Sequence, residues 1–383
     1  MGNLQIIPSV SLRNFHMLAH DYIILASKKI TEHDYDLALQ HLASALELLG
    51  SSDSNLQITL LGCRGDIFFK LNRFDKAKAE YMKALELDCK NHPHEAAIFF
   101  NLGTTLFEQK EYKISLSCFE TAVDLYTDQK AALKFQTKLY IGECLYLLGS
   151  LDEALPIFKQ ALEACDKTDI ARLFGINYKL ATAYREIKQF DSACIYAKNA
   201  YELTTPQDNY QYRYSCLVVL GDGYRAKNQF KDAFLIYEEC FNLLPEHENN
   251  SKAFESVNAG DMLSIQDEHQ RALDFYLQAI PLFDASQHLL KGDAALKCAV
   301  TFQDNQQFDK AIHYFTLATE TLGESDERYA TIQIKLADSI KQQKEQESHR
   351  ISISALNQNS LFAQSTSNPS DGASASIDGA RLH

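Results

Sequence analysis

The chain has 383 residues, of which 46% are hydrophobic, and it contains only 7 prolines and 15 glycines. This composition supplies a large apolar core and few loop-forming residues, so it favours helices over a sheet with many hairpins. The formal net charge of −14 argues against sequence-independent nucleic-acid binding, which needs clustered Lys and Arg to neutralise phosphates. An acidic surface of this kind suits solubility or basic partners.

The nine cysteines lie scattered along the chain, and no two of them form a CxxC pair. An odd number without metal-ligand spacing predicts reduced, buried thiols. No apolar run reaches the roughly 18 residues that a transmembrane helix needs, and residues 1–10 lack the basic start and apolar stretch of a secretory signal. We therefore expect a cytoplasmic protein without a membrane span and without a metal or other cofactor.

A frame of six positions recurs along the chain, and it is clearest from Gly103 through Leu106, Tyr112, Ser115 and Phe119 to Ala122. The fourth position recurs every 38 to 40 residues in eight units, at Ala38, Ala77, Ser115, Ala154, Ala193, Ala233, Ala272 and Ala311. Apolar residues recur at spacings of three and four within each unit, which is one face of a helix. Each unit is therefore predicted to be a pair of helices.

The frame has a physical reason in the way helices cross. A small residue such as Gly103 lets the next helix approach closely, and the aromatic ring sixteen residues later, here Phe119, fills the remaining gap. Short polar links such as residues 109–111 predict tight turns between the two helices. One hairpin cannot bury its apolar face alone, so neighbouring hairpins are expected to stack around a continuous core.

The run Leu102-Gly103…Leu106…Tyr112…Phe119…Ala122 resembles the signature of the tetratricopeptide repeat family, as does Leu220-Gly221…Tyr224…Phe230…Ala233…Tyr237…Pro245. The resemblance covers residues 12–323. It implies an all-α, right-handed superhelical solenoid of about eight helix-turn-helix hairpins with a C-terminal capping helix. The period exceeds the family's usual 34 residues, and such lengthened units resemble those of kinesin light chain, spindle-orientation adaptors and bacterial peptide-pheromone receptors.

The composition predicts three segments. Residues 1–11 form an N-terminal extension, and residues 12–347 form the solenoid, whose last helix becomes wholly polar over residues 341–346, as a solvated cap should. Residues 348–383 are rich in Ser, Asn and Gly and are predicted to be a disordered tail, because they cannot bury enough apolar surface to fold.

No catalytic motif is present in the sequence, which lacks a Gly-rich phosphate loop, HExxH and GxSxG. His92 and His94, with Cys89, could mimic a metal site, but a fourth ligand is not evident and Pro93 marks a turn. We interpret this segment as a linker between the second and third units. The protein is predicted not to be an enzyme.

The resemblance also implies a binding site, because in this family the first helix of each hairpin lines a concave groove that holds a peptide. Arg185 and Arg225 are expected to project in parallel and, with Lys179, to capture a carboxylate, a phosphate or an acidic segment. The alternative is ordinary ion pairing, since Glu186 and Asp222 are close in sequence. Transferred unit by unit, the peptide-binding positions are Asn101, Thr104, Phe107, Tyr140, Glu143, Tyr146, Tyr178, Lys179, Arg185, Asp222, Arg225, Asn258, Asp261 and Lys297.

Chaperone-binding members of the family use Lys and Asn on one first helix, Asn on the next, and Lys with Arg on the third. Asn101 alone fits this clamp, because Gly62 and Asp66 precede it and Gln136 and Tyr140 follow it. Recognition of chaperone C-termini is therefore not expected. The predicted function is a non-catalytic scaffold or adaptor that binds an extended or helical segment of a partner protein; the alternative is a regulatory peptide receptor whose superhelix changes conformation on ligand binding.

Overall fold

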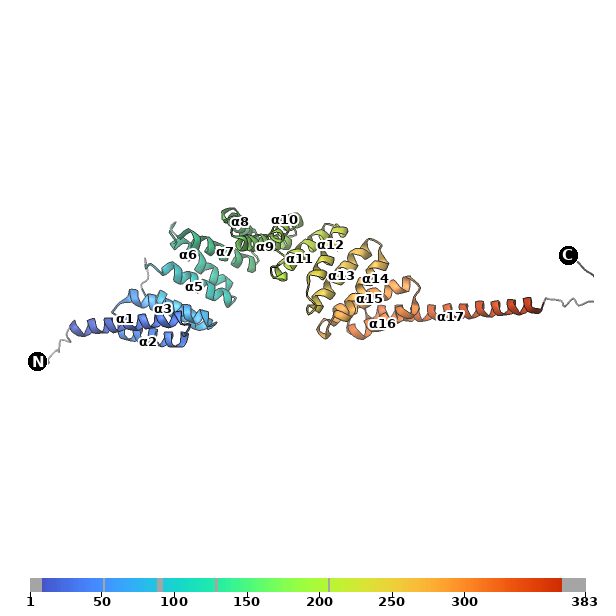
Figure 1. Cartoon of the computed structure of the whole chain (residues 1–383), viewed down its shortest axis with the longest axis horizontal. Coiled ribbons are helices and arrows are strands. Elements are labelled where there is room, and N and C mark those ends of the chain that lie inside the picture. Colours follow the sequence, from blue (N-terminus) through green and yellow to red (C-terminus); the bar gives the residue numbers. More distant parts are fainter. Residues whose placement is uncertain (1–8, 51, 88–91, 128–129, 206, 367–383) are drawn as a thin grey trace, which may run out of the picture. The chain divides into compact units, whose positions relative to one another are not determined.

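The computed structural model describes residues 9–50, 52–87, 92–127, 130–205 and 207–366 (Figure 1). All regular secondary structure within these ranges is helical. The chain divides into two compact units, Met1–Thr205 and Pro206–His383. Each unit is a series of antiparallel helical hairpins, which confirms the predicted all-α repeat fold.

The first unit contains five hairpins, in which an odd-numbered helix is followed by an even-numbered one. Their bounds are α1 Ser9–Thr31, α2 Tyr35–Leu49, α3 Ser54–Lys70, α4 Phe74–Glu86, α5 Glu95–Glu108, α6 Tyr112–Leu125, α7 Ala131–Leu147, α8 Leu151–Ala164, α9 Ile170–Glu186 and α10 Phe190–Glu202. The odd-numbered helices are called first helices below, and the even-numbered ones second helices.

The second unit contains three hairpins and a final helix. Their bounds are α11 Tyr210–Ala226, α12 Phe230–Leu243, α13 Asn249–Ile265, α14 His269–Ala279, α15 His288–Asp304, α16 Phe308–Leu322 and α17 Tyr329–Thr366, with the short 3₁₀ helices η2 Ile280–Leu282 and η3 Ala285–Gln287 between α14 and α15. The eight hairpins of the two units are the eight units of the sequence frame.

Every hairpin turns through the same short link. In the second hairpin, Asn72 adopts the left-handed conformation with φ of 56°, and the Arg73 N–H donates to the Phe68 carbonyl oxygen at 2.8 Å. This is a Schellman motif, which satisfies carbonyl groups at the end of the first helix. The left-handed residue recurs in all eight hairpins, at His33, Asn72, Lys110, Gly149, Lys188, Asn228, Asp267 and Gln306.

The predicted contact between a small residue and an aromatic ring is confirmed. A Cβ atom added to Gly65 would lie 2.4 Å from the ring of Tyr81, and one added to Gly103 would lie 2.7 Å from Phe119. Real Cβ atoms do not approach so closely, so glycine is what lets the two helices of these hairpins cross at this distance.

The terminal boundaries differ from the prediction. α17 continues to Thr366 as one long helix (Figure 1), beyond the predicted end of the array at residue 347, and α1 begins at Ser9 instead of residue 12. Residues 348–366 contain neither glycine nor proline, so nothing in this segment stops the helix. Ile332 of α17 is buried in the core of the second unit, as expected of a capping helix. Residues 1–8 and 367–383, the ends of the predicted extension and tail, lie outside the described residues.

Candidate protein-binding face of the first helices

Neighbouring first helices are joined by side chains that the sequence assigned to the groove. The Asn101 amide of α5 donates a 2.8 Å hydrogen bond to Asp66 of α3, and the Tyr81 hydroxyl donates to the same oxygen at 2.6 Å. Burial raises the pKa of Asp66 although both donors oppose this. Asn101 is the one residue that fits the chaperone clamp, and its amide is already engaged within the repeats. Thr104 also bonds internally, to the carbonyl oxygen of Asn101 at 2.9 Å.

The first helices α5 and α7 meet through aromatic rings. Tyr140 of α7 stacks on Phe119 with centroids 5.0 Å apart, and it makes edge contacts with Phe100 and Phe107, each at 5.7 Å. Tyr140 and Phe107 are each partly exposed. The two predicted groove residues are therefore brought together in one aromatic cluster that the packing holds in place.

Charged and aromatic side chains link α7 to α9. Lys179 pairs with Glu143 at 3.5 Å, and its ammonium group lies 5.9 Å from the ring centroid of Tyr146. The Tyr146 hydroxyl donates to Glu186. Partial burial, together with this hydrogen bond, raises the pKa of Tyr146. Tyr178 extends the face by stacking on Phe174, four residues earlier in α9, with centroids 6.1 Å apart and parallel rings.

In the second unit, the predicted groove carboxylates are engaged with cations of the chain itself. Lys297 of α15 reaches both Asp261 of α13, at 2.7 Å, and Asp293, at 3.2 Å. Asp222 pairs with Arg225 at 3.2 Å. This pair lies within α11 and does not join two repeats, so the capture of an acidic group by Arg225 stays a prediction.

Asn258 differs from the prediction because it is buried, whereas a groove position should be accessible. Its amide donates to Glu255 at 3.2 Å, and the Tyr214 hydroxyl donates to the same carboxylate at 2.7 Å. A buried carboxylate needs such donors, so the environment of Glu255 accounts for the burial of Asn258. Glu255 was not among the site residues predicted from the sequence.

The sequence contains a further signal, which pairs a Tyr of the second helix with an Asp of the first helix. Three hairpins have Tyr as the aromatic of the second helix, and in each the hydroxyl donates to an Asp that directly follows the small residue of the first helix. The hairpins with Phe have Thr104, Glu143 or Val300 in place of this Asp. The combination of Gly-Asp with Tyr fifteen residues later would have identified Asp222 and Asp261 as structural partners.

The predicted pair of arginines spans the two compact units. Arg185 belongs to the first unit and Arg225 to the second, so their parallel projection stays a prediction. Burial raises the pKa of Tyr146, and the positive charge of Arg185 opposes this in part.

The described thiols are poor nucleophiles. Seven of the eight described cysteines are buried, and none of the eight forms a disulfide. Burial raises the pKa of Cys118 and Cys144 to about 11 and that of Cys216 and Cys298 to about 12. The thiolate is the reactive form, so these cysteines act as small core residues, as predicted.

The histidine pair lies in a helix-to-helix link. The Glu95 N–H at the start of α5 donates to the carbonyl oxygen of His92 at 3.0 Å, and His92 Nε2 lies 3.2 Å from the carbonyl oxygen of Asn55. His94 directly precedes α5. Cys89 lies outside the described residues. Among those that are described, no group of three or more side chains is arranged to hold a metal ion, and no helix is long and apolar enough to cross a membrane.

Family models described as tetratricopeptide repeat match residues 56–128 and 111–168. The fold resembles two solved structures. One is the C-terminal part of a tetratricopeptide-repeat protein from Cytophaga hutchinsonii, with a TM-score of 0.56 and 17% identity over 70% of this chain and 97% of that one. The other is the apo form of the quorum sensor NprR from B. thuringiensis, with a TM-score of 0.50 and 13% identity over 81% of this chain and 88% of that one. The matched part of the chain, residues 56–168, is therefore of the tetratricopeptide-repeat type.

Three curated proteins are similar over parts of their length. RNA polymerase-associated protein CTR9 of Caenorhabditis elegans is 20% identical over 76% of this chain and 27% of its own length. Heat shock protein STI1 of Saccharomyces cerevisiae is 25% identical over 51% of this chain and 29% of its own, and a BBSome complex member BBS4 homolog of Drosophila melanogaster is 24% identical over 51% and 37%. The chain thus spans well under half of the length of these relatives.

Proposed function

We propose that this protein is a non-catalytic scaffold whose first helices hold a segment of a partner protein. The observation that carries the proposal is the strip of partly exposed side chains across α5, α7 and α9, formed by Phe107, Tyr140, Tyr146, Tyr178 and Lys179. Aromatic residues supply large contact areas, and they are enriched at protein interfaces. Helical repeats present such strips along stacked units, which suits a partner segment several residues long.

The internal contacts of the strip support this reading. Lys179 is held by Glu143 and Tyr146, and Tyr140 is held by the rings around it. A side chain that is fixed before binding loses less conformational entropy when the partner arrives, so these contacts favour affinity. The described cysteines form no disulfide, which fits a reducing compartment, and we infer a cytoplasmic location on that basis.

A photo-cross-linking experiment tests the scaffold role. A benzoylphenylalanine residue at Tyr178 should cross-link a partner in extracts of the source cells, whereas the same residue at Ile195, an exposed position of α10, should not. Replacing Lys179 by Glu should abolish the cross-link. Capture that is equal at both positions, or that is indifferent to Lys179→Glu, would contradict the proposal.

A second candidate is a regulatory peptide receptor. It is supported by the fold likeness to the apo form of a quorum sensor. A receptor should show a smaller radius of gyration in small-angle scattering once a cross-linked partner peptide has been identified and added. A passive scaffold should keep its radius.

A further inference from the structure

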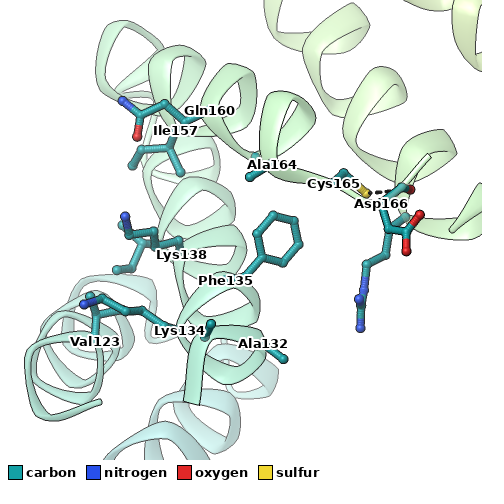
Figure 2. A pocket seen from close by; sticks show the side chains of 14 residues that line it. Val123, Ala132, Lys134, Phe135, Lys138, Ile157, Gln160, Ala164, Cys165 and Asp166 are labelled. Carbon is teal, nitrogen blue, oxygen red and sulfur yellow. Dashed lines mark hydrogen bonds between the residues drawn. The ribbon is translucent and has the colours of Figure 1, made fainter. Parts of the chain in front are cut away.

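A groove opens between neighbouring hairpins of the first unit, and none of the residues predicted to bind peptides lines it. It has a volume of about 830 Å³ and is lined by α6, α7, α8, the segment that leads into α9, and the first turn of α9. Pockets that bind ligands measure roughly 300–1,000 Å³. Figure 2 shows Phe135 in the middle of the labelled residues, with Lys134 and Lys138 to one side of it and Cys165 and Asp166 to the other.

The groove has an apolar floor. Val123 of α6, Phe135 and Ile141 of α7 and Ile157 of α8 are only partly buried, and Ala164 at the end of α8 is exposed. Apolar side chains from three helices thus converge on one space that these helices leave open. Burying such surface against a partner is favourable, and contiguous apolar patches on a protein often mark interaction sites.

Three basic side chains also line the groove. Lys134 and Lys138 lie four residues apart on α7, which is about 6 Å along a helix, and neither makes an ion pair with any described residue. Arg172 adds a third cation, which pairs with Asp169 at 3.1 Å. Asp166 is the one carboxylate among the lining residues, and its Oδ1 accepts two hydrogen bonds from the residue two positions later. A basic rim in a chain of net charge −14 points to an acidic ligand.

The residue that lies four positions before the small residue of a first helix is exposed in α7 but not in the other first helices from α3 to α15. Lys138 lies four residues before Gly142, the small residue of its unit, and it is exposed. In the other first helices from α3 to α15, no residue at the same position is exposed, and all but one are buried: Leu61, Phe99, Asn177, Leu217, Ser256 and Ala295, of which Phe99 is the partly buried one. A position that elsewhere packs inside the array is therefore open to solvent in α7.

We propose that this groove binds an amphipathic helix of a partner protein, with an apolar face against Phe135 and Ile157 and with Asp or Glu residues one helical turn apart against Lys134 and Lys138. A helix satisfies its own backbone hydrogen bonds, whereas an extended segment would need main-chain partners that this floor of apolar side chains does not supply. Two carboxylates at positions i and i+4 of a helix have the same spacing as the two lysines. The groove shares no lining residue with the strip on the first helices, and the proposal does not depend on that strip.

The test uses the full chain and a fluorescein-labelled helical peptide of about five turns, with leucines on one face and glutamates beside them. Fluorescence anisotropy should show binding that weakens as salt is raised. The double variant Lys134→Glu/Lys138→Glu should raise the Kd about tenfold or more. The matched control Lys113→Glu/Lys231→Glu changes the net charge equally at exposed lysines outside the groove, and it should leave the Kd within about twofold.

Two further variants separate the groove from the other face. Ala164→Trp should fill the groove and weaken binding, while Ala330→Trp, an exposed alanine of α17, should not. Lys179→Glu should leave the peptide bound. The proposal is wrong if the wild-type chain does not bind the peptide, if a peptide with lysines in place of glutamates binds as well, or if Lys179→Glu has the effect expected of the groove variants. Equal binding by a proline-containing, non-helical peptide of the same composition would overturn the choice of a helix.

Discussion

The hydroxyl of Tyr276 donates a 2.8 Å hydrogen bond to Asp261, the residue that follows Gly260 in the partner helix of the same hairpin. Asp261 also accepts from Lys297 of the next hairpin. One carboxylate therefore ties the two helices of its hairpin to each other and to the following repeat. The same Tyr–Asp pair occurs at Tyr81 and Asp66, with 2.6 Å, and at Tyr237 and Asp222, with 3.3 Å.

This relationship can be tested by removal and by transplantation. Tyr276→Phe should lower the free energy of unfolding by about 1 kcal/mol, the usual net value of a hydrogen bond. In the eighth hairpin, Phe315 and Val300 stand at the same two positions, and Phe315 is fully buried. Phe315→Tyr should therefore bury an unsatisfied hydroxyl and cost about 1–3 kcal/mol, while Val300→Asp added to it should recover part of that loss. Urea denaturation followed by circular dichroism measures both, and an uncorrected double variant would contradict the pairing rule.

The close approach of the two helices predicts opposite effects for two glycines. A Cβ atom at Gly260 would lie 2.6 Å from the Tyr276 ring, so Gly260→Ala should destabilise the protein by about 1–3 kcal/mol. Gly175 lies inside α9 with nothing within 4 Å of its Cβ position, and Gly175→Ala should stabilise the protein by about 0.5–1 kcal/mol. Thermal unfolding of the two variants should shift in opposite directions; a shared direction would refute the packing role of Gly260.

The left-handed residue of the hairpin link predicts a second pair of opposed variants. Lys188 has a φ of 61° and Gly149 a φ of 81° at the same position of adjacent hairpins. A side chain is strained in this conformation and glycine is not, so Lys188→Gly should raise the free energy of unfolding by about 0.5–1 kcal/mol. Gly149→Lys should lower it by about 1–2 kcal/mol. Equal stability of both variants and the wild type in urea would rule out strain at this position.

The buried carboxylate of the second unit predicts a dependence of stability on pH. Burial raises the pKa of Glu255 above its ordinary value, and this outweighs the hydrogen bonds from Tyr214 and Asn258 that favour the ionised form. Asp222 raises this pKa further and Arg225 lowers it. Between the ordinary pKa of a glutamate and the raised pKa of Glu255, the native state therefore binds more protons than the unfolded state. Under that condition the free energy of unfolding falls as pH rises through the native pKa.

Glu255→Gln removes this titration while its amide oxygen can still accept from Tyr214. The variant should be more stable than the wild type at pH 8, and its unfolding free energy should decline less between pH 5 and pH 8, as measured by urea denaturation at several pH values. Glu324→Gln is the matched control, because Glu324 is exposed in the same unit and makes no ion pair with any described residue. A wild-type curve that rises over this range would show that Glu255 is not the controlling group.

The residue pattern alone was sufficient to predict the eight hairpins, and the predicted turn at residues 109–111 lies between α5 and α6 in the structure. These features depend on contacts within one hairpin, where a small residue, a ring sixteen residues later and a short link are all visible in about forty positions of sequence. The end of α17 was missed because a helix stops at breakers, and residues 348–366 contain none. The composition of residues 348–366 predicted disorder, whereas α17 extends to Thr366.

Only the packing of one hairpin on the next shows which partner each polar side chain contacts and whether it is buried. Asp261 and Asn258 looked accessible by position, yet Lys297 engages one and the carboxylate of Glu255 engages the other. Lys138 occupies a position that is not exposed in the other first helices from α3 to α15, and only the arrangement of α6, α7 and α8 opens it to solvent. The burial of a side chain depends on the neighbouring hairpin, some forty residues away in the chain. The repeated frame does not encode how closely that hairpin packs over it.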